Sequence, residues 1–161
     1  MKNIVLMRHA KSNWADSEKT DHERTLNARG RKDAPVIAKE IMTRGVIPDL
    51  IFVSDSQRTR ETWEFIKPLF PNAKTQFTND LYLASSGTIA KLISMIDPVI
   101  DVVLILAHNP GITEAFHTIA NVRIDNVPTA GVGCISLHSD KFQNVGVSET
   151  SIDYFIYPKM L

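Results

Sequence analysis

The sequence predicts an α/β fold, a three-layer α/β/α sandwich in which helices cover both faces of a mostly parallel central sheet. Three uninterrupted apolar runs, at residues 4–7, 50–53 and 102–106, have the composition of strands that are buried on both faces. A stretch with helical spacing follows each run, and this alternation is typical of parallel strands joined by crossover helices. No repeat, linker or low-complexity tract interrupts the chain, so residues 1–161 are expected to form one domain.

The helix after the first apolar run is expected at residues 28–44. Asn27 is a suitable N-cap residue, and Gly45 is a suitable residue to end the helix. Pro35 lies inside this span and predicts either a kink or a later start. Four apolar side chains have the spacing of one helical face: Val36, Ile37, Ile41 and Met42.

The remaining elements follow from the same patterns. Residues 14–24 are polar and lack periodicity, which predicts a loop over the end of the first strand. Trp63 is expected in the core because it has helical spacing with Ile66 and Phe70. Further helices are expected at 57–70, 88–96 and 112–120, and further strands at 75–78, 132–137 and 152–157.

Composition excludes several classes of function. Eighteen Lys and Arg balance eighteen Asp and Glu, so no bulk positive field indicates a nucleic-acid partner or an acidic membrane surface. The single cysteine, Cys134, cannot form an internal disulfide and is expected to be a small packing residue. Neither a signal peptide nor an apolar run of membrane-spanning length is present, so a cytoplasmic location is expected.

Four residues with suitable chemistry follow the three apolar runs. Arg8 and His9 come after the first, Arg58 after the second and His108 after the third. Because the carboxyl ends of parallel strands lie along one edge of a sheet, these side chains can meet. Two arginines can hold the oxygens of a phosphoryl group, one histidine can attack phosphorus, and the other can donate to an oxygen. The sequence therefore predicts a phosphoryl-transfer site.

The stretch from Arg8 to Ser12 resembles the signature of the histidine phosphatase superfamily, and the chain is most similar to the SixA-like phosphohistidine phosphatase branch of that superfamily. This resemblance covers nearly the whole chain and implies a phosphoglycerate mutase-like fold. Two residues depart from the pattern: Ala107 replaces a usual Gly and Thr25 a usual Pro, and neither change removes a reactive group. The other matching residues are Trp14, Asp21, Arg24, Leu26, Asn27, Arg29, Gly30, Ser54, Arg58, Thr62, Asp80–Tyr82, His108–Gly111 and Pro128–Thr129.

The resemblance implies a two-step mechanism. Neutral His9 attacks phosphorus, and water then hydrolyses the phosphohistidine enzyme. Arg8, Arg58 and His108 hold the phosphoryl oxygens throughout. No metal and no cofactor are expected, because these groups supply the charge neutralisation that Mg²⁺ provides elsewhere. Burial among cations should keep the pKa of His9 low and the ring uncharged.

The general acid and the supporting residues are less sharply defined by the sequence. Asp21, in the loop after the nucleophile, is the preferred acid, and Asp80 is the alternative, with a structural cap as its other interpretation. Lys11 and Ser12 are candidates for substrate binding. Several other residues receive structural interpretations: Ser54 bonded to the turn that carries Arg58, Arg60 in surface ion pairs, Arg24 and Arg29 ordering the first loop and helix, and His22, His117 and His138 at the surface or as caps.

The expected substrate is phosphohistidine in a protein partner, with phosphate ion as the product. Two alternatives stay open: a phosphatase for small phosphate esters, and a catalytically silent module that binds phosphorylated partners. Neither nucleic acid nor a membrane is expected as a partner. A phosphoryl group trapped on His9 would separate an enzyme from a binding module.

Overall fold

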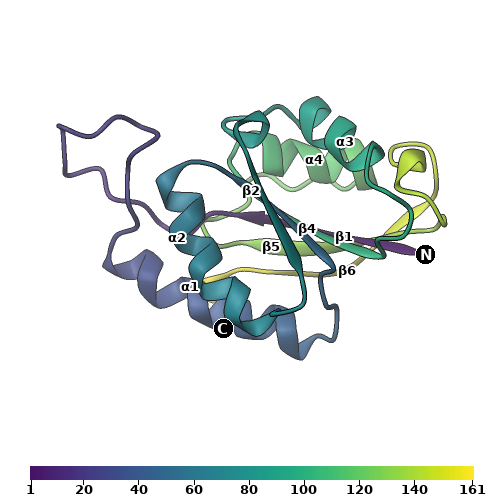
Figure 1. Ribbon diagram of the computed structural model, residues 1–161, viewed down its shortest axis with the longest axis horizontal. Coiled ribbons are helices and arrows are strands. Elements are labelled where there is room, and N and C mark those ends of the chain that lie inside the picture. The colour runs from purple at the N-terminus through teal and green to yellow at the C-terminus, as the bar shows by residue number, and fades with distance from the viewer.

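A computed structural model describes residues 1–161 and places all six strands in one sheet, in the order β3-β2-β4-β1-β5-β6 (Figure 1). The strands are β1 (Lys2–Arg8), β2 (Leu50–Ser54), β3 (Lys74–Thr78), β4 (Val102–Ala107), β5 (Val132–Leu137) and β6 (Thr150–Ile156). The α-helices are α1 (Ala28–Thr43), α2 (Gln57–Ile66), α3 (Ser86–Ser94) and α4 (Gly111–Ala120). Four short 3₁₀ turns complete the chain: η1 (Lys67–Leu69), η2 (Asn79–Leu81), η3 (Phe142–Asn144) and η4 (Pro158–Met160).

The sheet is mostly parallel, which confirms the predicted fold class. Strand β1 pairs in parallel with β4, β4 with β2, and β2 with β3. On its other side β1 pairs antiparallel with β5, which in turn pairs antiparallel with β6. Helices α3 and α4 cover one face and α1 and α2 the other (Figure 1), so the molecule has the three expected layers.

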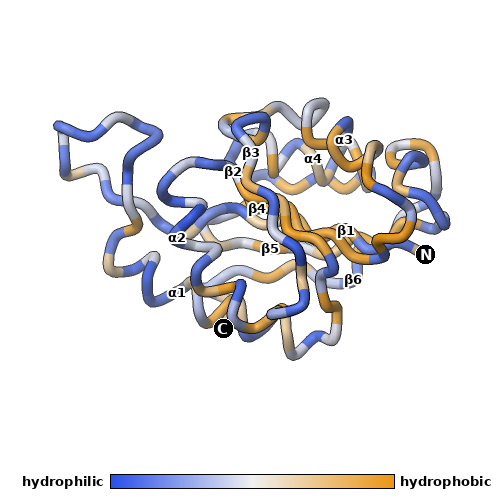
Figure 2. The backbone as a smooth tube through the Cα atoms, in the orientation of Figure 1, coloured by the Kyte–Doolittle hydropathy of each residue, from blue (hydrophilic) through white to orange (hydrophobic).

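Strand β1 explains why its apolar run shows no alternation. Ile4 and Leu6 pack in the core beneath α3 and α4, whereas Val5 and Met7 pack in the core beneath α1 and α2. All four side chains are fully buried. Because both faces of a central parallel strand are covered, every position must be apolar. Figure 2 shows the same result as a hydrophobic centre crossed by the strands, with hydrophilic segments around it.

Helix α1 begins as predicted and differs in its buried face. The side chain of Asn27 accepts a hydrogen bond from the amide of Gly30, at 2.9 Å, and the helix continues through Pro35 without a break. Val36 and Met42 are exposed, contrary to expectation, because neither lies on the buried stripe of the helix. That stripe uses smaller side chains than expected: Gly30, Ala34, Ile37, Ala38 and Ile41.

Helix α2 is shorter than predicted. It ends at Ile66 and is followed by the η1 turn, which contains Pro68. Proline has no backbone N–H and cannot continue an α-helical ladder, so the chain tightens into a 3₁₀ turn there. The loop between β1 and α1 has neither helix nor strand beyond one isolated bridge, between Ser12 and Leu26, and it projects from one end of the molecule (Figure 1).

Two further expectations can be compared with the structure. Cys134 is fully buried and free, which confirms its packing role. None of the helices combines the length and the apolar character that crossing a bilayer requires.

Candidate active site

The three strand ends meet as predicted. In the sheet Arg8 lies opposite Ala107, so His9 and His108 leave neighbouring strands side by side, with ring centroids 5.2 Å apart. Arg58 comes from the first turn of α2. A hollow of about 240 Å³ opens at this edge and is lined by Arg8, His9, Lys11, Ser12, Trp14, Asp21, Arg24, Arg58, Leu83, His108, Asn109 and Thr129.

His9 is held as a neutral ring whose Nε2 carries a lone pair. Its Nδ1 lies 2.7 Å from the carbonyl oxygen of Ala10, which can only accept, so Nδ1 carries the proton and Nε2 carries the lone pair. Arg58 donates from Nε to this Nε2 across 3.4 Å. Burial lowers the pKa of His9 well below its usual value, and the neighbouring His108 and Arg58 lower it further. A neutral imidazole is the form that can attack phosphorus.

His108 faces the hollow with its other nitrogen. Its Nε2 lies 2.8 Å from the hydroxyl of Ser54, while its Nδ1 is buried and has no hydrogen-bond partner in the protein. Burial, followed by the charge of Arg58, lowers the pKa of His108 to about 3, so this ring is also neutral near pH 7. The hydroxyl of Ser54 does not bond the turn that carries Arg58, contrary to expectation. The backbone carbonyl of Ser54 does so instead, by accepting a hydrogen bond from Thr59 Oγ1 at 2.6 Å.

Unpartnered buried atoms identify the ligand chemistry. Arg8 donates from Nη1 to the carbonyl of Val127, at 3.0 Å, but its Nε has no partner. Thus Arg8 Nε and His108 Nδ1 are both buried and unpaired at the same hollow. Burying polar atoms without partners costs free energy that an oxygen ligand bonded to both would recover. An anion with several oxygens therefore fits this site.

Arg58 is almost fully buried and joins the nucleophile to the loop between β1 and α1. Besides its contact with His9, it donates from Nη1 to the backbone oxygen of Asp21, at 2.7 Å, and from Nη2 to the Asp21 carboxylate, at 3.1 Å. Thr62, one turn further along α2, accepts a hydrogen bond from the amide of Ala10, at 3.0 Å. Helix α2 is therefore fixed directly to the segment that carries His9.

The two candidate acids are placed very differently. Asp21 lines the hollow, but Tyr82, Arg58 and Arg24 all donate to its carboxylate. Burial acts to raise the pKa of Asp21, yet these hydrogen bonds and the charge of Arg58 outweigh it and lower the pKa to about 2. An ionised carboxylate has no proton to give, so its role as acid stays a prediction that this geometry does not favour. Asp80 is exposed in η2 and does not line the hollow, which corrects its selection as the alternative acid.

Tyr82 is a residue of the site whose role the sequence did not predict, whereas Arg24 orders the loop after β1, as expected. The η2 turn that leaves Asp80 outside brings Tyr82 in, with its hydroxyl 2.5 Å from Asp21. Arg24 is buried, donates to Ser12 Oγ at 2.6 Å and lies flat on the ring of Trp14, at 3.4 Å from the centroid. Tyr82 stands in a stretch already matched to the family, but nothing in one sequence shows that two segments meet at a carboxylate.

Other residues support the site from outside the hollow. His22 Nε2 lies 2.9 Å from the carboxylate of Asp55, and the His22 ring packs edge-on against the ring of Tyr82, with centroids 4.8 Å apart. This packing helps to hold Tyr82 in place. The prediction that Arg60 forms surface ion pairs is wrong. Its Nε donates to the carbonyl of Asp55, at 2.9 Å, and its guanidinium lies over Phe77, because the Asp55 carboxylate is already occupied by His22 and by Asn79.

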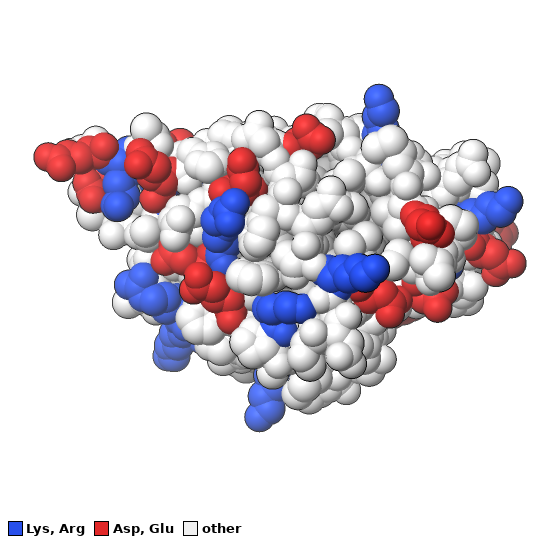
Figure 3. All heavy atoms as spheres, in the orientation of Figure 1, with Lys and Arg blue, Asp and Glu red and all other residues white.

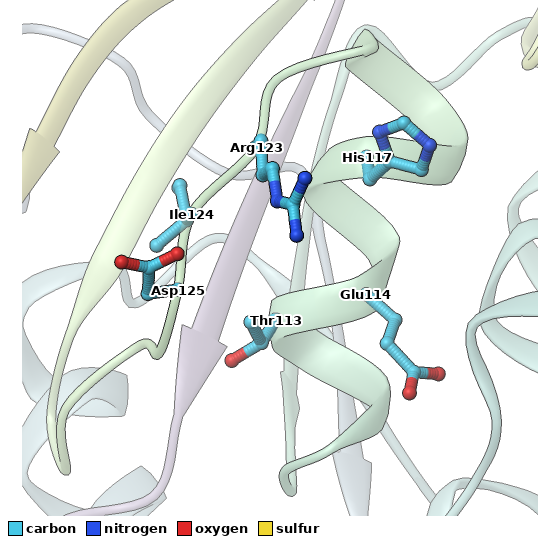
Figure 4. A pocket seen from close by; sticks show the side chains of 6 residues that line it. All are labelled: Thr113, Glu114, His117, Arg123, Ile124 and Asp125. Atoms are coloured by element: carbon cyan, nitrogen blue, oxygen red, sulfur yellow. The ribbon is translucent and has the colours of Figure 1, made fainter.

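A separate hollow of about 430 Å³ lies between α4 and the segment after it, lined by Thr113, Glu114, His117, Arg123, Ile124 and Asp125 (Figure 4). The guanidinium of Arg123 points into the space between segment and helix, while Glu114 and Asp125 point away from each other. No buried unpaired atom lies here, in contrast to the strand-edge hollow. Basic and acidic side chains are also interspersed over the face in Figure 3, so the anion site at the strand ends is a local feature.

Fold and site together define a class: an α/β protein with two buried, neutral histidines and a cationic cradle for an anion at the edge of its sheet. The family model of the histidine phosphatase superfamily (branch 1) matches residues 4–82, the stretch that carries Arg8, His9 and Arg58. The match places this stretch, 79 of the 161 residues, in the histidine phosphatase superfamily.

Other proteins are similar to this chain in sequence or in fold. An uncharacterised chloroplast protein of Arabidopsis thaliana is 32% identical over 131 residues, which cover 75% of this chain; the match spans only 60% of that relative's length. A protein assigned as phosphohistidine phosphatase SixA from Agrobacterium tumefaciens shares the fold with a TM-score of 0.85, at 24% identity and 98% coverage of both chains. A protein histidine phosphatase SixA in complex with tungstate has a TM-score of 0.83, at 14% identity and 98% coverage of both chains. These structural matches show the shared fold.

Proposed function

We propose that the protein is a metal-independent phosphatase that hydrolyses phosphohistidine in a protein partner, with His9 as the nucleophile. The observation that carries the proposal is the pair of buried, unpaired atoms, Arg8 Nε and His108 Nδ1, beside the lone pair of His9 Nε2. Together with Arg58 they offer one nucleophile and several donors to a single tetrahedral anion. The match of residues 4–82 to the histidine phosphatase superfamily supports the same chemistry.

The reaction follows from these contacts in two displacements. In the first, the lone pair of His9 Nε2 forms a bond to phosphorus, the bond to the leaving nitrogen breaks, and its electron pair stays with the departing imidazole. In the second, water attacks phosphorus, releases inorganic phosphate, loses a proton to solvent and restores neutral His9. Arg8, Arg58 and His108 donate to the phosphoryl oxygens in both steps and offset their negative charge.

The shape of the site supports a protein-bound substrate. The hollow is small, about 240 Å³, and its wall includes two side chains that are mostly exposed, Trp14 at 75% and Leu83 at 55%. A phosphorylated side chain that projects from another protein can reach such a shallow site. The fold is more similar to two proteins named as SixA phosphatases than to a glucosyl-3-phosphoglycerate phosphatase, with TM-scores of 0.85 and 0.83 against 0.74, and this supports the choice of phosphohistidine over a small ester.

A substrate comparison tests the proposal. Release of phosphate from a histidine-phosphorylated protein domain is measured beside release from a panel of sugar, nucleotide and aryl phosphates. Wild type is expected to prefer the domain, and His9→Ala is expected to lose turnover on all substrates. The matched control is His117→Ala, an exposed histidine on α4 outside the hollow, which should behave as wild type. A clear preference for one small ester would overturn the assignment of substrate.

Trapping the intermediate separates an enzyme from a silent binding module. Rapid acid-free quenching during turnover should show a phosphoryl group on wild type that is stable to alkali and labile to acid, as a phosphorus–nitrogen bond is. The same treatment of His9→Ala should show none. Wild type that binds the phosphorylated domain without forming this adduct or releasing phosphate would establish the binding-module alternative.

A further inference from the structure

The carboxylate of Asp21 is held from three directions inside the hollow. Its Oδ1 accepts from Arg24 Nε, at 3.1 Å, and its Oδ2 accepts from Arg58 Nη2, at 3.1 Å, and from the hydroxyl of Tyr82, at 2.5 Å. These donors come from the loop before α1, from α2 and from the segment after η2. The side chain nevertheless keeps 42% of its surface exposed, so one side of the charge remains open to a ligand.

Every neighbour of Asp21 keeps the carboxylate ionised. The two guanidinium groups can only donate, and burial together with the hydrogen bond to Asp21 raises the pKa of Tyr82, so the phenol also keeps its proton. Three hydrogen bonds donated to the two oxygens all favour the ionised carboxylate over the protonated acid. His22 contacts the ring of Tyr82 and pairs with Asp55 instead of Asp21. His108, whose pKa the charge of Asp21 acts to raise, is nevertheless neutral because of burial and the charge of Arg58. A fixed negative charge thus stands in a site otherwise built for an anion.

Arg58 relates this charge to the nucleophile. Its Nε lies 3.4 Å from His9 Nε2, and its Nη2 lies 3.1 Å from Asp21 Oδ2. Nucleophile and carboxylate therefore contact neighbouring nitrogens of one guanidinium. A phosphoryl group attacked by His9 must expel its leaving group on the side away from His9. Asp21 lines the same hollow and is partly exposed, so its carboxylate is available to that leaving group.

We propose that Asp21 is a specificity determinant that favours leaving groups carrying a protonated nitrogen, such as the imidazolium ring of phosphohistidine, over oxygen leaving groups. This inference rests on the proposed function and defines its substrate class. When the phosphorus–nitrogen bond breaks, its electron pair stays on the ring nitrogen, and the proton on the other ring nitrogen makes the departing imidazole neutral. An oxygen leaving group would depart as an anion toward Asp21, which has no proton to supply.

The charge of Asp21 raises the rate because it makes protonation of the phosphohistidine ring easier in the site than in solution. A phosphohistidine ring that is neutral in solution must gain a proton before it leaves. The Asp21 carboxylate accepts the resulting N–H and stabilises the cationic ring, so protonation becomes easier in the site than in water. An alkyl or aryl ester gains nothing from this contact, because its oxygen carries no N–H. The preference for a nitrogen leaving group therefore depends on the negative charge of the Asp21 side chain as well as on the shape of that side chain.

The experiment compares two leaving groups in the same variants. The probes are the phosphorylated amino acid phosphohistidine and p-nitrophenyl phosphate, and the variants are Asp21→Asn and, as matched control, Asp80→Asn, whose side chain is outside the hollow. Asp21→Asn is expected to reduce kcat/KM for phosphohistidine about 10- to 100-fold more than for the ester, the size expected for one hydrogen bond to a charged group. Asp80→Asn should leave the ratio of the two activities at the wild-type value.

The outcomes separate this inference from the function it builds on. Equal losses on both probes would mean that Asp21 only positions Arg58, and a larger loss on the ester would mean that it acts as a general acid; either overturns the inference and leaves the proposed function intact. Wild type that cleaves the ester and not phosphohistidine would overturn the proposed function, and the inference with it. A phosphoenzyme formed from either probe shows that each variant is folded.

Discussion

Ser54 Oγ lies 2.8 Å from Nε2 of His108, and this contact determines which nitrogen of His108 carries the proton. Ser54 is fully buried, and His108 Nε2 is the one acceptor within hydrogen-bond distance of its hydroxyl. A buried hydroxyl with no other acceptor donates to Nε2, which the hydroxyl of Ser56 also approaches, at 3.4 Å. The proton of the neutral ring is then on Nδ1, the nitrogen that has no partner in the protein. In this form His108 can donate to a phosphoryl oxygen without becoming charged.

Without the Ser54 hydroxyl, the proton of the neutral His108 ring should occupy either of the two ring nitrogens. Ser54→Ala is expected to reduce kcat/KM about tenfold, the cost of one buried hydrogen bond, while Ser54→Thr retains the donor and most of the activity. The ¹⁵N chemical shifts of His108 check the cause, since they distinguish the two tautomers. Wild type should show a protonated Nδ1 and Ser54→Ala a mixture. A wild-type ring protonated on Nε2 would contradict the assignment even if the activity fell.

Arg58 and Arg60 lie two residues apart on α2 and provide a matched pair of substitutions. Arg58 donates from all three of its nitrogens, to His9 and to Asp21, in a geometry that a lysine ammonium cannot copy. Arg60 lies outside the hollow, against Asp55 and Phe77. Arg58→Lys should lower kcat/KM roughly 100-fold, since it loses more than one charge-assisted hydrogen bond, whereas Arg60→Lys should stay within about twofold of wild type. Steady-state kinetics of both variants test this prediction. Equal losses of kcat/KM would refute the different roles assigned to Arg58 and Arg60.

The sequence predicted the cradle because its parts are encoded locally. Arg8, His9, Arg58 and His108 each stand directly after a buried apolar strand or in the turn that follows one, and parallel strands necessarily bring such positions to one edge. No long-range information was needed beyond the parallel order of the strands. The same reasoning explains why the fold class was confirmed.

The surroundings of Asp21 could not be predicted in the same way. Arg24, Tyr82 and Asp21 lie on segments without regular periodicity, and their contacts depend on how a loop folds back over the strand edge. Asp80 is a related case: it is exposed in the η2 turn while Leu81 beside it is buried, and pattern alone does not tell which residue of a turn faces inward. Loop conformation, rather than residue chemistry, is the missing information.

The buried neutral histidines predict a loss of stability in mild acid. Burial lowers the pKa of His108 to about 3 in the folded protein, whereas an unfolded histidine titrates near its usual value of 6.5. Between these values the unfolded chain binds one more proton, so the free energy of unfolding should fall by about 1.4 kcal/mol for each pH unit below 6.5, and His9 adds to the slope in the same direction. Above pH 6.5 this contribution is fully present.

Urea denaturation between pH 7 and pH 4 tests this sign. His108→Gln should reduce the slope by about 1.4 kcal/mol per pH unit, because the variant no longer holds a neutral ring in the folded state. His117→Gln, at an exposed position on α4, should keep the wild-type slope. A His108→Gln slope equal to that of wild type would mean that the buried ring is already protonated when folded.

The start of α1 lies so close to the segment after His9 that only glycine fits at position 30. A Cβ placed on Gly30 would lie 2.2 Å from the backbone oxygen of Lys11, which no real contact allows. Gly30→Ala must therefore push Lys11 away from the hollow or move the helix. It should lower the free energy of unfolding by about 1–3 kcal/mol, as overpacking does, and also lower kcat/KM.

Gly87, near the start of α3, supplies the control for Gly30. Its added Cβ would meet only the hydroxyl of Ser85, at 3.8 Å, an ordinary contact. Gly87→Ala should then raise stability by about 0.5–1 kcal/mol through the lower backbone entropy of alanine, with kcat/KM unchanged. Thermal and urea unfolding of the two variants give the comparison. If Gly30→Ala were as stable and as active as wild type, the close approach of α1 to the nucleophile segment could not be a requirement of the site.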